Sequence, residues 1–575
     1  MTTVLLSFRF SLLTELLVTM EIGKHLAIFL SASAAAILAI ALLPSFDLLT
    51  SPRFSLKSSS ERTVADLVVT DAFIYTSDSS LPFAQAMAIG NGRILRVGNA
   101  SSIQDLIGHR TQVLNLEGKV VAPGFFDSHV HFIPGGLQMA RVELRDVKSK
   151  EEFVRMIEGV VKDKQMDYWV LGGGWNNEHW GGDLPAASWI DDITPNNPVW
   201  LSRMDGHMGL ANSLSLKIAG ITNDTKDPAG GTIMRTADGE PTGLLVDSAM
   251  KLLLPWIPEV SVEERREALL RASKLALARG VTTVVDFGRY FPGSPVEFVW
   301  EDFSDVYQWA DSAGKMLIRV CQFFPMETWP RLVALVQETG RALSQWIYLG
   351  GVKAFSDGSL GSNSALFYEV NYVDEPDNYG LQVTDTDWLL KMILASDKSG
   401  LQIAVHAIGD KANDLVLNLS ETVALTNGIR NRRFRPDHLL DDADSAVKKL
   451  GFDRAQRESY LFRSLLSNEA RLTFGSDWPV ADINPLRAIR TAMFRIPPGG
   501  EDAWIPSECV TLTDALKAYT ISAAYASFLD NDLGSLSPGK LADFVVLSTD
   551  SWEDFTKEAS ASVLATYVSG KQAYP

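Results

Sequence analysis

Short apolar runs alternate with amphipathic stretches across the middle of the chain. The apolar runs cover residues 120–132, 168–175, 198–203, 280–288, 348–358, 401–410 and 470–480, and segment 262–280 is typical of the amphipathic stretches. Alternating βα units of this kind favour a parallel sheet that is covered on both faces. Polar residues stand at the carboxyl ends of the runs. We therefore predict an α/β fold with a (β/α)8 TIM-type barrel over residues 121–530 and its chemistry at that rim.

Two β-rich pieces flank the predicted barrel. Residues 65–120 contain short β-rich runs separated by turn signals such as Gly90-Asn91-Gly92, which is the pattern of antiparallel hairpins. Residues 531–575 contain a second piece of the same kind. We expect the two pieces to pair into one small β-sandwich domain.

The N-terminal region carries an uncharged apolar run at residues 26–43, close to the length of about 20 residues that spans a bilayer. We expect a transmembrane or signal-anchor helix within residues 1–45, followed by a solvated linker at 46–64. A cleaved signal peptide and a buried core helix are the alternatives. An anchor predicts a single-pass membrane protein, which we expect in the endomembrane system, at the endoplasmic reticulum or around the nucleus. The flanking charges fix no orientation.

Composition narrows the class of protein. A chain of 575 residues with 46% hydrophobic and 21% charged residues is an ordinary globular protein. Its 52 basic and 70 acidic residues give a net charge of −18, which repels nucleic acid. Two cysteines, far apart in sequence, exclude a disulfide framework and a cysteine zinc site.

Candidate metal ligands stand at the ends of several predicted strands. His129 and His131 end the first run, and residues i and i+2 of a strand point to one face, so both imidazoles can reach one ion. Later strand ends add Lys353, His406 and Asp477. This pattern indicates a metal site.

Four ordered motifs strengthen that interpretation. They are G-F-F-D-S-H-V-H at 124–131, V-K-A-F-S-D-G-S-L-G-S at 352–362, H-A-I-G-D at 406–410 and G-S-D-W-P-V at 475–480. From about residue 65 to the C-terminus the chain resembles the amidohydrolase superfamily, in its YtcJ-like amidohydrolase 3 branch. The resemblance implies a hydrolase of carbon–nitrogen bonds other than peptide bonds, a small amide-like substrate and one or two divalent ions, expected to be zinc. It is also compatible with a homodimer.

The resemblance assigns roles to the first group of ligands. His129, His131 and Asp477 would bind the first ion, and Asp477 would also accept the proton of the attacking water. That carboxylate could then pass the proton to the leaving amine.

The second group of ligands has alternatives. The resemblance implies that Lys353 is carboxylated by CO2 and bridges two ions, whereas an ordinary lysine would pair with Asp357 and leave a one-metal site. His406 would bind the second ion, or would instead orient the substrate.

Residues near the substrate are also implied. Asp205 and His207 follow the run at 198–203 and resemble an R-x-D-x-H segment beside the substrate, although they could simply cap a helix. Trp175 follows three glycines and could form an aromatic wall or belong to a turn. Asp357 is the fourth residue that we expect near the substrate.

One expected ligand is missing. Members of this branch place a further histidine at the end of strand six, but the one histidine between His406 and Asp477 is His438, in a segment that resembles strand seven. His406 and Asp477 are 71 positions apart, whereas the three βα units from strand five to strand eight of a barrel need about 93 residues. By contrast, the chain is long earlier on: 222 positions separate His131 from Lys353, for the same number of units.

Two readings of the gap are open. Either the strand-six segment is absent, as in an alternative transcript that joins Arg435 to Pro436, or His438 takes the place of the missing ligand. The first reading supports a second hypothesis, a membrane-tethered pseudoenzyme that acts as an interaction or regulatory scaffold. A third is a deaminase or cyclic-amide hydrolase of the same superfamily.

Overall fold

The computed structural model describes residues 64–368, 372–433, 435–437, 443–496, 502–552, 554 and 561–575. The predicted anchor at residues 26–43 and the substitute ligand His438 lie outside these residues, so both stay predictions. Within the described part of the chain, no helix is both long enough and apolar enough to cross a bilayer.

Two sheets are built from the β-rich ends of the folded part. One has the strand order β5-β4-β1-β6, with β1 at Leu67–Thr70, β4 at Ala86–Gly90, β5 at Arg93–Gly98 and β6 at Gln112–Asn115. The other has the order β22-β21-β20-β7-β2-β3, with β2 at Phe73–Tyr75, β3 at Phe83–Ala84, β7 at Val120–Pro123, β20 at Phe544–Leu547, β21 at Val563–Val568 and β22 at Lys571–Tyr574.

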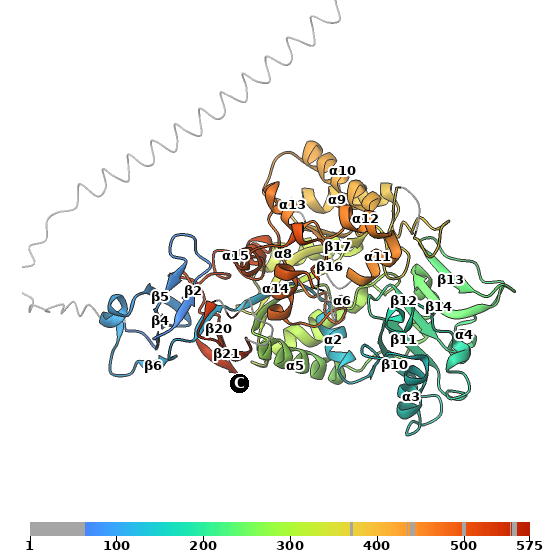
Figure 1. Cartoon of the computed structure of the whole chain (residues 1–575), viewed down its shortest axis with the longest axis horizontal. Helices are drawn as coiled ribbons and strands as arrows, with labels where there is room; N and C mark the ends of the chain where they lie inside the picture. The colour runs from blue at the N-terminus through green and yellow to red at the C-terminus, as the bar shows by residue number, and fades with distance from the viewer. Residues whose placement is uncertain are drawn as a thin grey trace, which may run out of the picture. The chain divides into compact units, whose positions relative to one another are not determined.

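The second of these sheets joins the two ends of the folded part. Strands β7 and β20 are antiparallel, with Ala122 opposite Val545, so the blue and red strands lie side by side (Figure 1). Both strands are fully buried and rich in valine, which suits a pleated surface covered on both sides. Apolar side chains of both sheets, among them Met87 and Phe544, form one core. The predicted pairing of the terminal pieces is therefore present.

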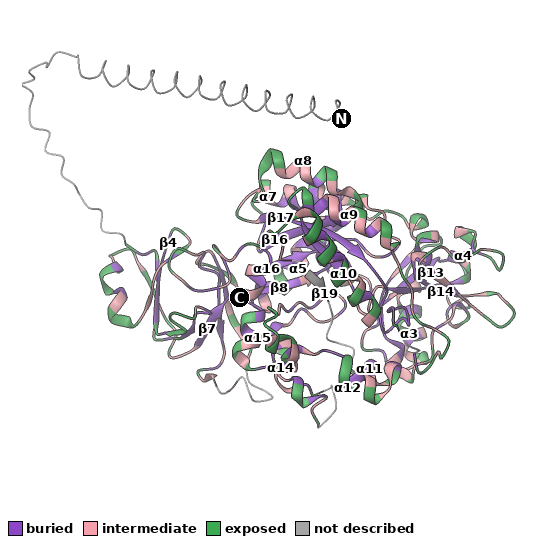
Figure 2. Cartoon of the chain, turned by 90° about the horizontal axis from the view of Figure 1, so that it is seen from above, coloured by how far each residue is buried: buried purple, intermediate pink, exposed green. Residues whose placement is uncertain are grey.

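A curled parallel sheet forms the centre of the molecule, and its burial is clear at β16 and β17 (Figure 2). Its order is β19-β18-β17-β16-β15-β8, with β8 at Phe125–Val130, β15 at Val281–Asp286, β16 at Arg319–Pro325, β17 at Ile347–Phe355, β18 at Gln402–His406 and β19 at Arg435–Asp437. Helices cover this sheet; for example, α5 buries Ala268, Leu269 and Ala272 against it and starts at a Ser261 cap.

The helices have the following bounds: α2 Phe132–Gln138, α3 Lys150–Val161, α4 Ser213–Ala219, α5 Val262–Ala278, α6 Glu297–Asp302, α7 Trp309–Ser312, α8 Trp329–Thr339, α9 Thr386–Lys398, α10 Asp410–Asn427, α11 Ala443–Leu450, α12 Phe452–Glu458, α13 Phe462–Ser467, α14 Pro485–Phe494, α15 Leu512–Ala518 and α16 Ile521–Ala526.

The predicted closed barrel of eight strands is only partly formed. Segment 474–478 runs beside β8 like a further strand, because the Asp477 amide donates to the His129 carbonyl at 2.7 Å and the His131 amide donates to the Trp478 carbonyl at 2.8 Å. Between His406 and Asp477, the described residues contain one strand, β19, where a complete barrel has two. The α/β class is confirmed, and the parallel sheet is a half-barrel.

The expected strand-seven segment occupies an unexpected position. Strand β19 is parallel to β18, with His406 opposite Asp437, which is the sixth place in the sheet. The short spacing between His406 and Asp477 therefore corresponds to one strand fewer, among the described residues, than a complete barrel has.

The extra length before Lys353 forms a separate sheet. Its order is β13-β14-β12-β11-β10-β9, with β9 at Val142–Glu143, β10 at Val170–Trp175, β11 at Val199–Arg203, β12 at Met208–Ala211, β13 at Gly231–Arg235 and β14 at Pro241–Asp247. The prediction that runs 168–175 and 198–203 are barrel strands is wrong. Strand β11 turns back into antiparallel β12, so its apolar residues are buried in this inserted sheet instead.

Candidate metal centre

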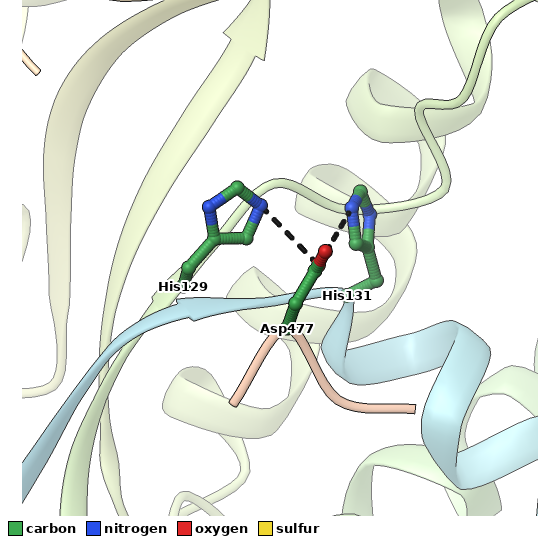
Figure 3. Close-up of side chains that lie close together, drawn as sticks. All are labelled: His129, His131 and Asp477. Carbon is green, nitrogen blue, oxygen red and sulfur yellow. Dashed lines mark ion pairs between the residues drawn. The ribbon is translucent and has the colours of Figure 1, made fainter. Parts of the chain in front are cut away.

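Three predicted ligands converge at the end of β8 (Figure 3). His129 Nε2 lies 3.3 Å from Asp477 Oδ1, and His131 Nε2 lies 3.5 Å from the same oxygen. One ligand atom from each of the three residues lies within 4.8 Å of the others. Asp477 has a φ of 51°, in the left-handed region that aspartate tolerates better than most residues.

The tautomer of His131 suits a metal ligand. Its Nδ1 lies 2.7 Å from the carbonyl oxygen of Gly288, to which it donates, so the lone pair is on the Nε2 that faces Asp477. Burial and the neighbouring His129 hold the pKa of His131 well below its usual value. The imidazole is therefore neutral, which is the form that binds a metal ion.

A buried carboxylate ties Asp477 to β8. Asp127 accepts hydrogen bonds from the Ser476 hydroxyl at 2.7 Å and from the Ser476 amide at 2.9 Å. Burial raises the pKa of Asp127 to about 6, although these hydrogen bonds oppose the shift. Gly475 permits the close approach, since a Cβ there would lie 2.5 Å from the His129 amide nitrogen.

Lys353 lies in β17 beside the same centre. It is 1% exposed, and its Nζ is 4.6 Å from the centre of the Phe287 ring, which also contacts His129 at a ring distance of 4.1 Å. Burial and neighbouring histidines are the larger causes of the low pKa values of His131 and His406, and the charge of Lys353 is a further cause. Lys353 therefore lies within electrostatic reach of both predicted metal positions.

His406 and His207 form a second group. Their ring centres are 4.8 Å apart, and His207 Nδ1 donates to Asp247 Oδ1 at 2.6 Å. Burial lowers the pKa of His207, but Asp247 outweighs it and the net shift is upward. His406 Nε2 lies 3.1 Å from the Gly358 carbonyl oxygen, and burial holds its pKa well below the usual value.

Asp357 packs behind this second group. Its Oδ2 accepts from the amides of Leu366 and Gly409, each at 2.9 Å, and its Oδ1 accepts from the Ile408 amide at 3.1 Å. Burial raises the pKa of Asp357 to about 7 despite these hydrogen bonds. It therefore holds the loop after β17 against the loop after His406.

Asp205 connects two loops. Its Oδ2 accepts from Arg203 at 2.8 Å, from the Ser359 hydroxyl at 2.5 Å and from the Ser362 hydroxyl at 2.8 Å. The carboxylate is therefore already engaged in joining the inserted sheet to the loop after β17.

Trp175 does not fit the expected aromatic wall. It is 0% exposed, its Nε1 donates to the Leu201 carbonyl at 2.8 Å, and its ring belongs to the core of the inserted sheet. The preceding glycines permit close approach between strands, because a Cβ at Gly173 would lie 2.1 Å from the Ser202 carbonyl oxygen.

Sequence reasoning missed the residues that hold the ligands. Asp286 accepts from the amides of Phe132 at 2.8 Å and Gly288 at 2.9 Å, and so fixes the carbonyl that orients His131. An aspartate inside or at the end of an apolar run is the sequence signal that both Asp127 and Asp286 share.

A family comparison identifies the class of protein. Residues 112–574 match the model of the amidohydrolase family, so the chain belongs to that family. It is 60% identical to Protein LONG AFTER FAR-RED 3 of Arabidopsis thaliana, over 95% of this chain and 98% of the relative. It is also 31% identical to putative amidohydrolase YtcJ of Bacillus subtilis (strain 168), over 83% and 93% of the two chains. These matches confirm the predicted amidohydrolase 3 branch.

Two further comparisons concern chemistry. The chain is 28% identical to N-substituted formamide deformylase of Arthrobacter pascens, over 88% of this chain and 98% of the relative. Its fold is similar to that of an uncharacterized metal-dependent hydrolase from Pyrococcus horikoshii, with a TM-score of 0.65, 25% identity and coverage of 84% and 97%. The relatives support a hydrolase, and together with the three-residue cluster they imply a divalent metal.

Proposed function

We propose that this protein is a metal-dependent amidohydrolase that cleaves a non-peptide carbon–nitrogen bond of a small amide-like substrate. The convergence of His129, His131 and Asp477 carries the proposal. Two imidazole nitrogens and one carboxylate oxygen are donors that suit Zn2+ and leave room for a further ligand.

The metal ion and the side chains have different roles in the proposed reaction. When bound, a divalent ion supplies Lewis acidity that activates water and polarises a carbonyl group. Asp477 takes the proton of the attacking water and delivers it to the leaving nitrogen, so that amide and water become acid and amine. His207, whose pKa Asp247 raises, would donate a hydrogen bond to the substrate.

Lys353 and His406 support a second metal position. Carboxylation of Lys353 would replace a buried cation with an anion that can bridge two ions. The proximity of Lys353 and His406 to the first site, through Phe287 and Phe355, supports this arrangement. His438 is the proposed substitute for the absent strand-six histidine.

A second candidate function is a pseudoenzyme scaffold tethered to a membrane by residues 26–43. The single strand β19 in the described chain between His406 and Asp477 favours it, because a damaged barrel would hold the second ion weakly. The first candidate is preferred, since the three ligands of the first position are assembled without that strand.

Hydrolysis of a defined panel tests the proposal. Purified full-length protein is assayed with N-substituted formamides and short N-acyl amines, and amine release is measured before and after chelation and Zn2+ restoration. We expect turnover that disappears with chelator and returns with metal. Ammonia release from cyclic amides or amino-heterocycles would favour a different reaction, and no turnover by metal-loaded protein would favour the scaffold.

A further inference from the structure

A cavity of about 230 Å³ lies where α2 and the segment after Asp477 meet the inserted sheet. It shares a wall with the metal centre, because Phe291 lines it and also stacks on His131 with ring centres 4.1 Å apart. Pro479 and Val480, just after Asp477, line it as well. A group in this cavity would therefore lie next to the reacting centre.

Most of the cavity lining is apolar. Its hydrophobic residues include Leu137, Leu171, Trp200, Met250, Leu254 and Phe298. Such a lining favours an aliphatic or aromatic group over a polar chain. The volume is below the range of about 300–1,000 Å³ that is usual for whole ligands, so the cavity suits one arm of a substrate.

The charged lining is strongly basic, although the whole chain has a net charge of −18. Four arginines line the cavity, with Glu259 as the acidic residue among them. Arg289 pairs with Glu259 at 2.7 Å and with Asp302 at 2.7 Å, and Arg203 pairs with Asp205 at 2.8 Å. These two arginines are therefore neutralised by carboxylates.

The other two arginines make no ion pair with a carboxylate in the described part of the chain. Arg145 donates to the backbone carbonyls of Pro479 and Val480, which carry no net charge. Arg141 is partly buried, and its guanidinium makes no hydrogen bond or ion pair with any described residue. Burial lowers the pKa of Arg141, the charges of Glu264 and Glu259 partly oppose this shift, and a guanidinium stays protonated in proteins. The cavity therefore contains a partly desolvated cation with free donors.

We propose that this cavity binds the anionic end of the substrate, a carboxylate on a short apolar or aromatic arm, with Arg141 as its partner. The planar donors of arginine match a carboxylate, and the apolar walls hold the arm. This proposal rests on the proposed function, because it places the amide at the metal centre and the carboxylate beyond Phe291. It defines the substrate class as amides that carry a carboxylate.

Binding of a matched pair of probes tests the cavity separately from catalysis. Calorimetry on the full-length protein compares 3-phenylpropionate with 3-phenylpropanamide, which have nearly the same shape and differ in charge. Because hydrogen bonds between charged partners are stronger than neutral ones, we expect the carboxylate to bind about tenfold more tightly or better. Equal affinities in the unmodified protein would overturn the proposal.

Variants assign the preference to one side chain. Arg141→Met should abolish the preference for the carboxylate, Arg141→Lys should keep most of it, and Arg155→Met, on the exposed face of α3, should leave it unchanged. A preference that survives in Arg141→Met, or disappears in Arg141→Lys, contradicts the assignment. Circular dichroism confirms that each variant is folded.

Chelation separates this site from the metal. After removal of metal, the preference for the carboxylate should persist, since Arg141 and not the ion recognises it. A preference that is lost with the metal would overturn the cavity proposal while supporting a metal site. A protein that keeps the preference but shows no hydrolysis would instead remove the proposed function and leave the anion site.

Discussion

His131 is held between two partners that act on opposite nitrogens of its ring. Nδ1 lies 2.7 Å from the Gly288 carbonyl oxygen, and Nε2 lies 3.5 Å from Asp477 Oδ1. Because the carbonyl can only accept, the proton belongs on Nδ1 and the lone pair faces Asp477. The ligand is therefore oriented by the fold before any ion binds.

Replacing Asp477 with asparagine should separate metal binding from proton transfer. Asp477→Asn keeps an oxygen near both imidazoles but cannot take the proton of water, so kcat should fall by about 100-fold or more. Steady-state kinetics alongside metal analysis check this. The exposed Asp453→Asn serves as the control, and unchanged kcat in Asp477→Asn would exclude the carboxylate as the base.

The hydrogen bond from Ser476 to Asp127 should matter for both stability and metal affinity. Ser476→Ala removes a buried 2.7 Å contact, which should lower the free energy of unfolding by about 1–3 kcal/mol. Metal affinity should fall by roughly 10–100-fold, because Asp477 loses its support. Denaturant melts and competition with a chelator measure the two effects. The exposed Ser467→Ala should show neither, and the same affinity in both variants would count against a positioning role.

Asp286 should make stability depend on pH. Burial raises the pKa of Asp286 to about 6 from 3.8, so the folded chain holds a proton that the unfolded chain releases between these values. The free energy of unfolding should therefore rise by up to about 3 kcal/mol from this group as the pH falls through that window, and fall again as the pH rises.

The matched variant isolates this contribution. Asp286→Asn keeps an acceptor for the amides of Phe132 and Gly288 but has no proton to gain. Denaturant melts at several pH values should give a flatter difference curve for the variant. Parallel curves for the two proteins would show that Asp286 does not titrate in this range.

A buried ion pair should stabilise the junction between the half-barrel and the terminal strands. Arg319 in β16 contacts both oxygens of Asp543, at 2.8 and 2.9 Å, and its side chain is 0% exposed. Arg319→Met leaves the Asp543 carboxylate buried without its cation and should lower the free energy of unfolding by about 3–5 kcal/mol. The double variant Arg319→Met with Asp543→Leu should recover much of this loss. Denaturant melts measure both, and additive losses would argue against a direct pair.

The sequence predicted the local parts of the fold well. The H-x-H pair lies at the end of a buried strand because the apolar run that starts at Val120 forms β7 and β8, and the terminal β-rich pieces pair through β7 and β20. Lys353 and His406 also stand at strand ends, as expected. These features depend on periodicity that a short window contains.

Other features depend on contacts that no local pattern contains. An apolar run such as Val199–Arg203 fits a barrel strand and an inserted sheet equally well, and antiparallel pairing with β12 decides between them. Trp175 is buried in the core of the same inserted sheet. The roles of Asp127 and Gly288 arise from neighbours more than 150 positions away, so sequence spacing could not predict them.

Metal content tests the central claim most directly. Full-length protein should retain about one equivalent or more of a divalent metal by mass spectrometry, and His129→Ala with His131→Ala should reduce this to a small fraction. Exposed His109→Ala should match the unmodified chain. Equal metal content in all three proteins, or none in the unmodified chain after zinc loading, would contradict the account.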